Sequence, residues 1–274
     1  MSRTFLRLTA TLTALLVAPS LAAQHAGNAA APPAAAAAAS AAAGHGAPAL
    51  VSAESAGRLR PLRWLYVASL VGGGGTPQRL GFRTLELSAT TFDGTAAWLL
   101  VDSREMRTVT LAESLYVARA DLAPLRRVQR TAAIRVVSDF APDSIRTTFA
   151  TDTSRVAVAM PNQKGIVANV YLLEALLGTT PLRADWRGAT RLAAIGENGS
   201  GMVPIEEHIV GQEKVLVPDG AFDCWVVALE AGPSEEKFWV RKSDGVVIKE
   251  RVPVIGMDGS SVELLLALDG VQHP

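Results

Sequence analysis

The fold is decided by the stretch Val210–Val252, VGQEKVLVPDGAFDCWVVALEAGPSEEKFWVRKSDGVVIKERV. Its apolar runs stop at three turn signals, Pro218-Asp219-Gly220, Gly232-Pro233-Ser234 and Asp244-Gly245. Proline presets φ for a turn and glycine accepts a positive φ, so each signal predicts a chain reversal. Asp-Gly in particular favours the type I′ turn of a two-residue β-hairpin. The stretch therefore predicts an antiparallel meander of four strands.

The segment Ala221–Glu230 within this stretch is largely apolar on both faces. One face carries Phe222, Cys224, Val226 and Ala228, and the other carries Asp223, Trp225, Val227 and Leu229. Side chains alternate between faces along a strand, so we expect a central strand that is covered on both sides. The next strand, around 238–240, is flanked by charged residues that predict solvated strand ends: Glu235, Glu236, Lys237, Arg241 and Lys242.

The order VGxExVxVPxGxFDCWVVxLExG…FWVRKxDGVVIKE resembles the C-terminal half of uncharacterised bacterial cell-envelope domains of unknown function. These domains are grouped with the Lol-type (LolA/LolB-like) lipoprotein carriers of the periplasm. The resemblance is good over Val210–Val252 and loose over Leu99–Leu268. It implies a strongly curved antiparallel sheet, a half-barrel, with helix covering its concave side over an apolar cavity. The resemblance assigns no functional residue, because the carriers' ligand-contacting arginine matches no position of this chain.

Alternating apolar residues and turn signals continue outside this stretch. Phe82–Ala89 and Ala96–Arg104 predict two strands joined by a hairpin at Phe92–Thr95. Further strands are expected at 108–118, 126–140, 144–150, 155–160, 186–195, 203–217 and 262–268, and residues 64–71 are expected to form an apolar strand or a short helix. Together with the strands of the central stretch, we expect roughly nine to eleven strands. This pattern predicts a mainly β fold. We expect a curved antiparallel half-barrel with one or two helices over its concave face.

One segment, Ile166–Leu177, breaks the strand pattern. Its residues Ile166, Val170, Leu173 and Leu177 share one helical stripe, with Glu174 away from it. We expect Asn162 to cap the start of a helix, Gly178 to end it and Pro181 to prevent its continuation. Because nearly all of this segment is apolar, we expect the helix to be buried against the sheet, where it closes the mouth of the half-barrel.

The composition divides the chain into four parts. Residues 1–23 predict a secretory signal, with Arg3 and Arg7 before a short apolar run and small residues at Ser20–Ala23. Residues 24–57 are rich in alanine and proline and predict a disordered tether, 58–270 predict one β-rich domain, and 271–274 a tail. The apolar run is too short for a spanning helix, which takes about 20 residues. Cys224, the only cysteine, is far from the cleavage point. We therefore expect a periplasmic or secreted chain without a lipid anchor or a transmembrane segment.

No motif predicts a catalytic, metal or cofactor site. His208 is the only histidine of the expected domain and no Gly-x-Ser-x-Gly is present, which argues against a Ser-His-Asp triad. Neighbouring residues Glu206, Glu207 and His208 point alternately to opposite faces, which predicts a solvated strand edge rather than a zinc site. Cys224 is expected to be a buried small hydrophobe rather than a nucleophile. Acids and bases number 26 each, so we expect no nucleic-acid partner.

The leading hypothesis is a non-enzymatic envelope protein that binds a lipid, an acylated protein or another apolar small molecule in the half-barrel. Its candidate ligand-lining residues are Trp98, Val170, Leu173, Leu177, Trp225, Val227, Phe238 and Trp239. Ordinary core packing is the alternative explanation for them. The second hypothesis is a structural or protein-interaction module with a solid interior, which uses an apolar patch or a sheet edge. A third, an uncatalogued hydrolase, needs carboxylates such as Asp102, Glu105 or Asp223 to meet in a water-filled cleft.

Overall fold

The computed structural model describes residues 50–72, 76–107, 110–196, 199–231, 234–255 and 261–272. Within these ranges the chain forms two helices and fifteen strands, and all the strands belong to one sheet. The helices are α4 (Ala53–Arg58) and α5 (Val170–Leu177). The first strands are β1 (Leu62–Gly72), β2 (Gln78–Phe92), β3 (Thr95–Met106), β4 (Thr110–Ala118), β5 (Pro124–Arg130), β6 (Arg135–Phe140), β7 (Ser144–Ala150) and β8 (Arg155–Pro161). They are followed by β9 (Ile166–Val167), β10 (Arg187–Gly196), β11 (Gly199–Val217), β12 (Gly220–Ala231), β13 (Ser234–Arg241), β14 (Val247–Ile255) and β15 (Ser261–Gln272).

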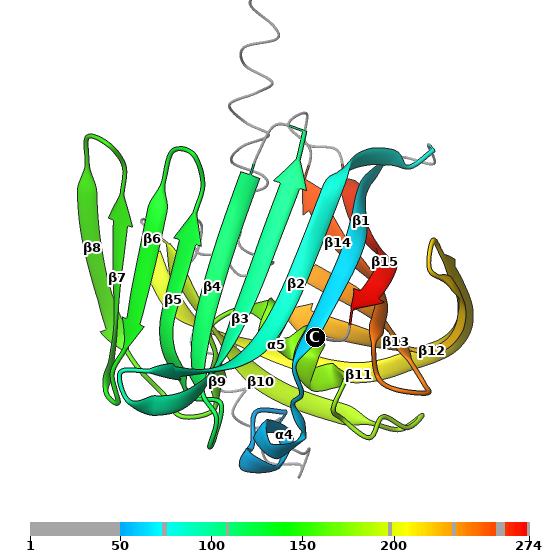
Figure 1. Cartoon of the computed structure of the whole chain (residues 1–274), viewed down its shortest axis with the longest axis horizontal. Helices are drawn as coiled ribbons and strands as arrows, with labels where there is room; N and C mark the ends of the chain where they lie inside the picture. The colour runs from blue at the N-terminus through cyan, green and yellow to red at the C-terminus, as the bar shows by residue number, and fades with distance from the viewer. Residues whose placement is uncertain are drawn as a thin grey trace, which may run out of the picture.

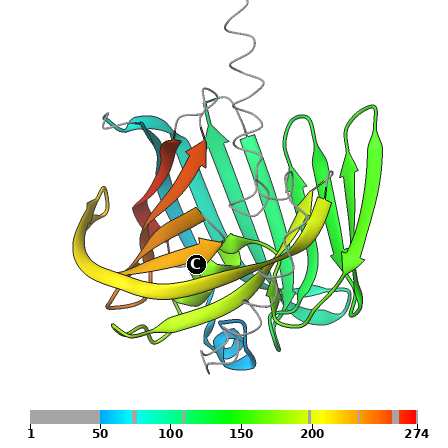
Figure 2. The same ribbon diagram turned by 180° about the vertical axis from the view of Figure 1, so that it is seen from behind.

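Two meanders make up the sheet, and they join where the first strand meets the last. The strand order is β8-β7-β6-β5-β4-β3-β2-β1-β15-β14-β13-β12-β11-β10-β9. Among the described strands every neighbouring pair is antiparallel except β9 and β10, which are parallel. The sheet curves strongly, so that the two meanders face each other with α5 between them (Figure 1). From behind, the long strands β11 and β12 sweep across the molecule (Figure 2).

The predicted fold class is confirmed, because the chain forms an open, curved, mainly antiparallel sheet with a helix on its concave side. The number of strands exceeds the predicted nine to eleven. The expected strand at 126–140 is two strands, β5 and β6, since Thr131 N donates to Ile134 O at 2.9 Å and closes a turn between them. A further strand, β9, occupies residues that were predicted to be helical.

The predicted helix is present as α5 but begins later than expected. Residues 166–167 form β9 and pair with β10, so the helix starts at Val170. Asn169 rather than Asn162 caps it, because the Asn169 side chain accepts a hydrogen bond from Leu172 N at 3.1 Å. Gly178 ends the helix as predicted. The start was misjudged because an apolar pair such as Ile166-Val167 suits a buried strand as well as a helix.

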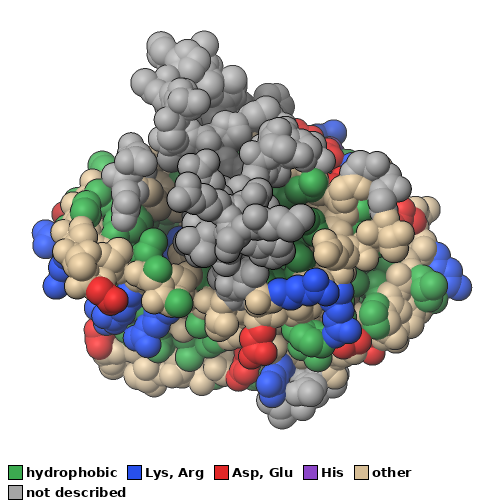
Figure 3. All heavy atoms as spheres, turned by 90° about the horizontal axis from the view of Figure 1, so that it is seen from above, with side chains coloured by type: hydrophobic (Ala, Val, Ile, Leu, Met, Phe, Trp, Pro, Cys, Tyr) green, Lys and Arg blue, Asp and Glu red, His purple; other side chains and the backbone are tan. Residues whose placement is uncertain are grey.

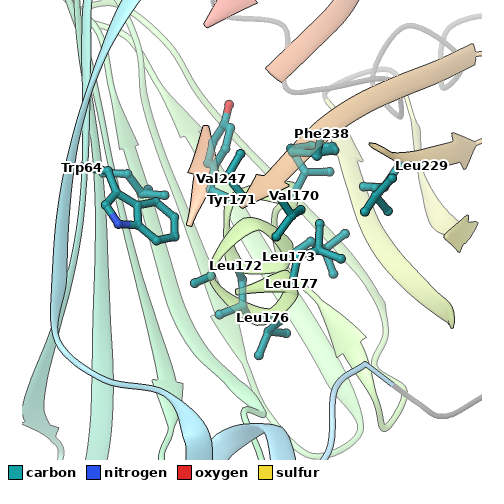
Figure 4. Packing of buried hydrophobic residues seen from close by; sticks show 14 of the residues in the cluster. Trp64, Val170, Tyr171, Leu172, Leu173, Leu176, Leu177, Leu229, Phe238 and Val247 are labelled. Carbon is teal, nitrogen blue, oxygen red and sulfur yellow. The ribbon is translucent and has the colours of Figure 1, made fainter. Parts of the chain in front are cut away.

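All eight residues of α5 are buried, and the helix lies at the centre of the main core. Figure 4 shows its leucines pointing toward the strands around it, with Leu229, Phe238 and Val247 among their neighbours. The expectation that this apolar helix is buried against the sheet is therefore confirmed.

The described part of the core begins at residue 50. Leu50, Ala56 and Leu59 are buried in the main core, and Arg58 Nη1 donates to Thr179 O, just beyond α5, at 3.3 Å. The packed chain thus extends into the range 24–57 that was predicted as a tether. The predicted signal at 1–23 lies outside the described residues. None of the described helices is long and apolar enough to cross a membrane.

Two Asp-Gly pairs make different turns. Asp93 and Gly94 both have positive φ, 46° and 79°, as a type I′ turn requires. At the other pair only Gly245 has a positive φ, 77°, and Arg241 N donates to Val246 O at 2.8 Å across a four-residue loop. The predicted type I′ turn at Asp244-Gly245 is therefore wrong, although the chain does reverse there.

The longer loop brings Gly245 against the end of α5, and we expect Gly245→Ala to destabilise the fold by about 3 kcal/mol. A Cβ at Gly245 would lie 2.1 Å from Gly178 O, a backbone atom, so the loop and the helix end would have to separate. Gly94→Ala is the matched control, because Gly94 has nearly the same φ but no atom within 4 Å of its added Cβ. Its cost should be about 1 kcal/mol, the strain of a left-handed alanine. Urea unfolding of both variants tests this, and equal losses would contradict it.

Candidate functional site

The concave side of the sheet carries a cluster of buried charges around Arg83. Tyr66 of β1, Arg83 of β2 and Arg104 of β3 are cross-strand partners and therefore share the inward face. Arg83 has no exposed surface. Its guanidinium makes three ion pairs with acids from different elements: Asp102 Oδ1 at 2.8 Å, Glu174 Oε1 at 2.6 Å and Glu250 Oε2 at 2.9 Å. One arginine thus joins both meanders and α5.

Aromatic rings surround this guanidinium. The Arg83 Cζ lies 4.5 Å from the ring centre of Tyr171 on α5 and 5.5 Å from that of Tyr66. Arg104 also stacks on Tyr171, at 4.6 Å, and donates to Asp102 Oδ2 at 3.0 Å. Burial opposes ionisation of Asp102, but the attraction and hydrogen bonds of Arg104 and Arg83 outweigh it and lower the pKa of this carboxyl. Asp102 is therefore ionised.

A second polar link holds the start of α5. Arg127 of β5 makes two hydrogen bonds with Glu113 of β4, at 2.9 and 2.8 Å, and all of these groups are buried. Glu113 Oε1 also accepts from Asn169 Nδ2 at 2.6 Å. Because Asn169 caps α5, this contact fixes the beginning of the helix, while the ion pair between Glu174 and Arg83 fixes its middle.

The cluster holds more acids than bases. Glu236 of β13 is fully buried. Among the described residues neither of its carboxyl oxygens has a hydrogen-bond partner, and Glu174 Oε2 has none either. Burial, with repulsion by the nearby Glu250, raises the pKa of Glu174 to about 8, although Arg83 opposes the rise. Burial, with repulsion by Glu250 and Glu174, raises the pKa of Glu236 well above its ordinary value. The raised pKa favours the protonated, neutral form of Glu236, which can act as a hydrogen-bond donor.

Another buried acid, Glu207 of β11, lies apart from this cluster. Only 1% of its surface is exposed, and neither carboxyl oxygen has a hydrogen-bond partner in the part of the chain that the structure describes. Its cross-strand partner is Gly188, and a Cβ there would come within 2.9 Å of both Glu207 Oε2 and the Trp186 ring. Burial raises the pKa of Glu207 to about 8.

The predicted ligand-lining residues do not form one surface. Trp98, Val170, Leu173, Leu177, Val227, Phe238 and Trp239 all belong to the main core. Phe238 pairs with Val227 and lies near α5 (Figure 4), but its neighbour Trp239 points to the opposite face. There the Trp239 indole donates to Glu213 and lies 4.3 Å from Lys249 Nζ. Trp225 is half-buried, stacks with Lys242, and lines a pocket of about 250 Å³ beside the loop at Gly245.

Two predictions about acidic residues are wrong. Glu236 was expected at a solvated strand end, and Glu207 at a solvated strand edge, yet both are buried. Glu207 is not on an edge, because β11 lies between β10 and β12. Sequence reasoning missed both because an inward-facing acid looks like an outward-facing one when its partners on other strands are unknown. His208 contacts Glu230 at 3.7 Å on the opposite face of β11.

Cys224 and the suggested carboxylates are also placed by the structure. Cys224 is fully buried in the main core, as predicted, and burial raises the pKa of its thiol to about 11. Asp102 lies in the interior, whereas Glu105 and Asp223 are exposed, so these three carboxylates do not meet. In the described ranges no three His, Cys, Asp or Glu side chains are grouped so that they could hold a metal ion.

No protein-family model and no curated protein matches this chain. Among solved structures it is similar to a β-barrel-like protein of the domain of unknown function DUF1849 from Brucella abortus, with a TM-score of 0.48 and 13% identity over 78% of this chain and 98% of that one. It is also similar to the hypothetical lipoprotein YmcC from Escherichia coli, with a TM-score of 0.31 and 12% identity over 86% and 94% of the two chains. These likenesses are too distant to support an argument about function.

Proposed function

We propose that this chain is a non-enzymatic binding protein of the cell envelope whose binding site is the space that α5 occupies. The ligand is apolar, such as a lipid or the acyl chain of a modified protein. The proposal depends on one observation: α5 is a wholly buried, mostly apolar helix on the concave side of an open sheet, and buried polar contacts hold it there. A helix of this kind that moves outward leaves an apolar hollow of its own size.

Glu174 supports a helix that can leave. Burying its carboxyl costs desolvation free energy that the ion pair with Arg83 offsets only in part, so leucine at this position would fill a permanent core with greater stability. An ion pair that forms only when α5 is seated instead selects one position of the helix. This ion pair between Glu174 and Arg83 breaks when α5 moves out of the core.

The strands around α5 supply apolar lining for such a ligand. Val227, Leu229 and Phe238 belong to the core that surrounds the helix. Burying one acyl CH₂ contributes about 0.8 kcal/mol, so a ~14-carbon chain gains roughly 11 kcal/mol before the cost of displacing the helix. That gain offsets part of the cost of moving α5 out of the core.

The absence of catalysis is part of the proposal. The acids that gather in the described chain, such as Glu174, Glu236 and Glu250, lie in the core with at most 2% of their surface exposed. A substrate or attacking water does not reach them while α5 is seated. This arrangement supports binding rather than the hydrolase hypothesis.

A second candidate, the solid interaction module, is favoured by the packing itself. Every side chain of α5 is buried, and its residues pack in one continuous core with both meanders. If α5 never leaves, binding takes place at the outer surface or at a sheet edge.

One experiment separates the two candidates. The chain is purified from a bacterial envelope for native mass spectrometry and is titrated with a fluorescent fatty acid. The first candidate predicts a bound lipid mass and probe uptake. It also predicts about tenfold tighter probe binding by Glu174→Gln, because the variant weakens the contact that seats α5. Glu86→Gln, which affects only a half-exposed ion pair with Arg63, is the control. Absence of lipid and probe from both wild type and Glu174→Gln would reject the apolar ligand and leave the solid module.

A further inference from the structure

Within the described part of the chain, one side of β8 is a free sheet edge. β8 (Arg155–Pro161) pairs with β7 over seven residues without a register shift, and no described strand pairs with its other side. Figures 1 and 2 both place it at the periphery of the molecule. Residues 156–160, VAVAM, carry no charge, and Val156 is 41% exposed. Soluble proteins usually protect such an edge with prolines, charges, bulges or a covering segment. In β8 a charge and a proline stand only at the two ends, Arg155 and Pro161, so the edge between them indicates a pairing surface.

The hydrogen-bond pattern shows which backbone groups are free. Thr151 N donates to Ser154 O at one end of the β7–β8 hairpin, and Asn162 N donates to Asp143 O at the other. Bonded pairs alternate along an antiparallel ladder, so the even-numbered residues of β8 bond to β7. The N–H and C=O groups of Arg155, Ala157 and Ala159 therefore point away from β7, toward an incoming strand.

The two faces beside this edge differ in chemistry. On the inner face, Val158 and Met160 pack against a second apolar cluster that includes Phe149 and Ile195. On the outer face, strands β5–β8 carry Arg126, Arg130, Arg135, Arg146 and Arg155, against Asp139 as their one acid. Several Lys and Arg side chains are visible at this end of the molecule (Figure 3).

Most of these arginines have no acidic partner in the described chain. Arg126 pairs with Asp139 at 2.7 Å, whereas no ion pair within the described residues involves Arg135, Arg146 or Arg155. Arg126, Arg135 and Arg155 line one pocket of about 330 Å³ on the outer face. The protein as a whole has no net charge, so this local excess of positive charge is specific to the β5–β8 end.

We propose that the β8 edge binds an extended peptide segment of a partner protein, which adds to the sheet as a further strand. The peptide places apolar side chains on the inner face, opposite Val156, Val158 and Met160. It places acidic side chains on the outer face, where one meets Arg155 and the other reaches over Ala159 to Arg146, the cross-strand partner of Ala159. In an antiparallel peptide this corresponds to the pattern apolar-acidic-apolar-any-apolar-acidic. The site is independent of the interior ligand proposed above.

Charge argues against a second copy of this chain as the occupant. In a dimer, the β8 strands of two copies would pair antiparallel, with Val158 of one copy opposite Val158 of the other. The two sheets would then form one continuous sheet, with the outer faces of both copies on the same side. The arginines at 146 and 155 of each copy would then approach those of the other, and like charges close together across strands are destabilising. An acidic peptide removes this repulsion and neutralises the same side chains.

The test uses the full chain and a fluorescent peptide that contains VEVTVE. We expect saturable binding by fluorescence anisotropy, at least tenfold weaker binding of the matched peptide VKVTVK, and loss of binding at high salt. Ala157→Pro removes one outward N–H without touching a bond to β7, so it should weaken VEVTVE binding at least tenfold while the urea midpoint stays unchanged. The pair Arg146→Glu and Arg155→Glu should reverse the preference in favour of VKVTVK.

Three results would overturn the proposal. The first is failure of wild type to bind VEVTVE. The second is equal binding by wild type and a folded Ala157→Pro variant, because the peptide would then lie elsewhere. The third is a dimer in solution that Ala157→Pro dissociates, since the occupant of the edge would then be a second copy of the chain.

Discussion

Replacing Arg83 by methionine is expected to lower the free energy of unfolding by about 3–5 kcal/mol, the largest loss from any single substitution considered. Removing one partner of a buried ion pair leaves the other charge without compensation. At this position three acids lose a partner at once, and Glu174 and Glu250 have no other ion pair within the described chain. Urea unfolding at pH 7, followed by tryptophan fluorescence, measures the loss.

Two further variants make this prediction specific. Arg63→Met removes an arginine from the neighbouring strand whose 3.9 Å ion pair with Glu86 is about half exposed, and it should change the free energy of unfolding by less than about 0.5 kcal/mol. Adding Glu174→Gln to Arg83→Met should recover part of the loss, because one unpaired acid disappears. A loss below about 1 kcal/mol for Arg83→Met would show that the contacts of Arg83 with Asp102, Glu174 and Glu250 add little to stability.

Stability should fall as the pH rises from about 4.5 to about 8. Glu207 has an ordinary pKa of 4.5 in the unfolded chain and about 8 in the folded one, because the folded protein buries it without a partner. Between these values the unfolded chain releases a proton that the folded protein keeps, so a rising pH favours unfolding. This one residue contributes a change on the order of 5 kcal/mol. Glu174 and Glu236 act in the same direction, whereas the lowered pKa of Asp102 acts only at more acidic pH.

The variant that checks this is Glu207→Gln, which has nearly the same shape but does not titrate. Its free energy of unfolding, measured in urea at pH 5, 6, 7 and 8, should decline less steeply than that of the wild type. Glu206→Gln, at the exposed neighbouring position, should retain nearly the full slope. Parallel curves for Glu207→Gln and wild type would mean that the Glu207 carboxyl is already ionised in the folded protein.

Local patterns predicted much of the fold. Apolar alternation and turn residues located most strands, and the apolar run before Gly178 located the helix and its burial. Lengths and boundaries depended on tertiary pairing, which the sequence does not display. Residues 166–167 became a strand only because β10 lies beside them.

The charged interior could not be predicted in the same way. Alternation would place Phe82 inside and Arg83 outside, but Phe82 is 36% exposed beneath Arg79, and Arg83 is fully buried. Arg83 tolerates burial because its partners come from segments that lie 19, 91 and 167 residues away in the sequence. No window of adjacent residues contains that information. The apolar cavity expected from the sequence is, in the described chain, occupied by α5 and crossed by these ion pairs.

The pairing of β1 with β15 has a consequence for the order in which the chain can be completed. The last described strand, β15, is the ninth of fifteen across the sheet counted from β8, where it is flanked by β14 and β1. A chain truncated before residue 261 would lack a strand from the interior of the sheet rather than from its edge. Both β1 and β14 would then lose the strand with which they pair. Joining the ends near Arg63 and Gln272, which are direct partners, and reopening the chain between β8 and β9 would preserve every strand pairing. Such a circular permutant should fold to the same sheet with both new ends at the rim.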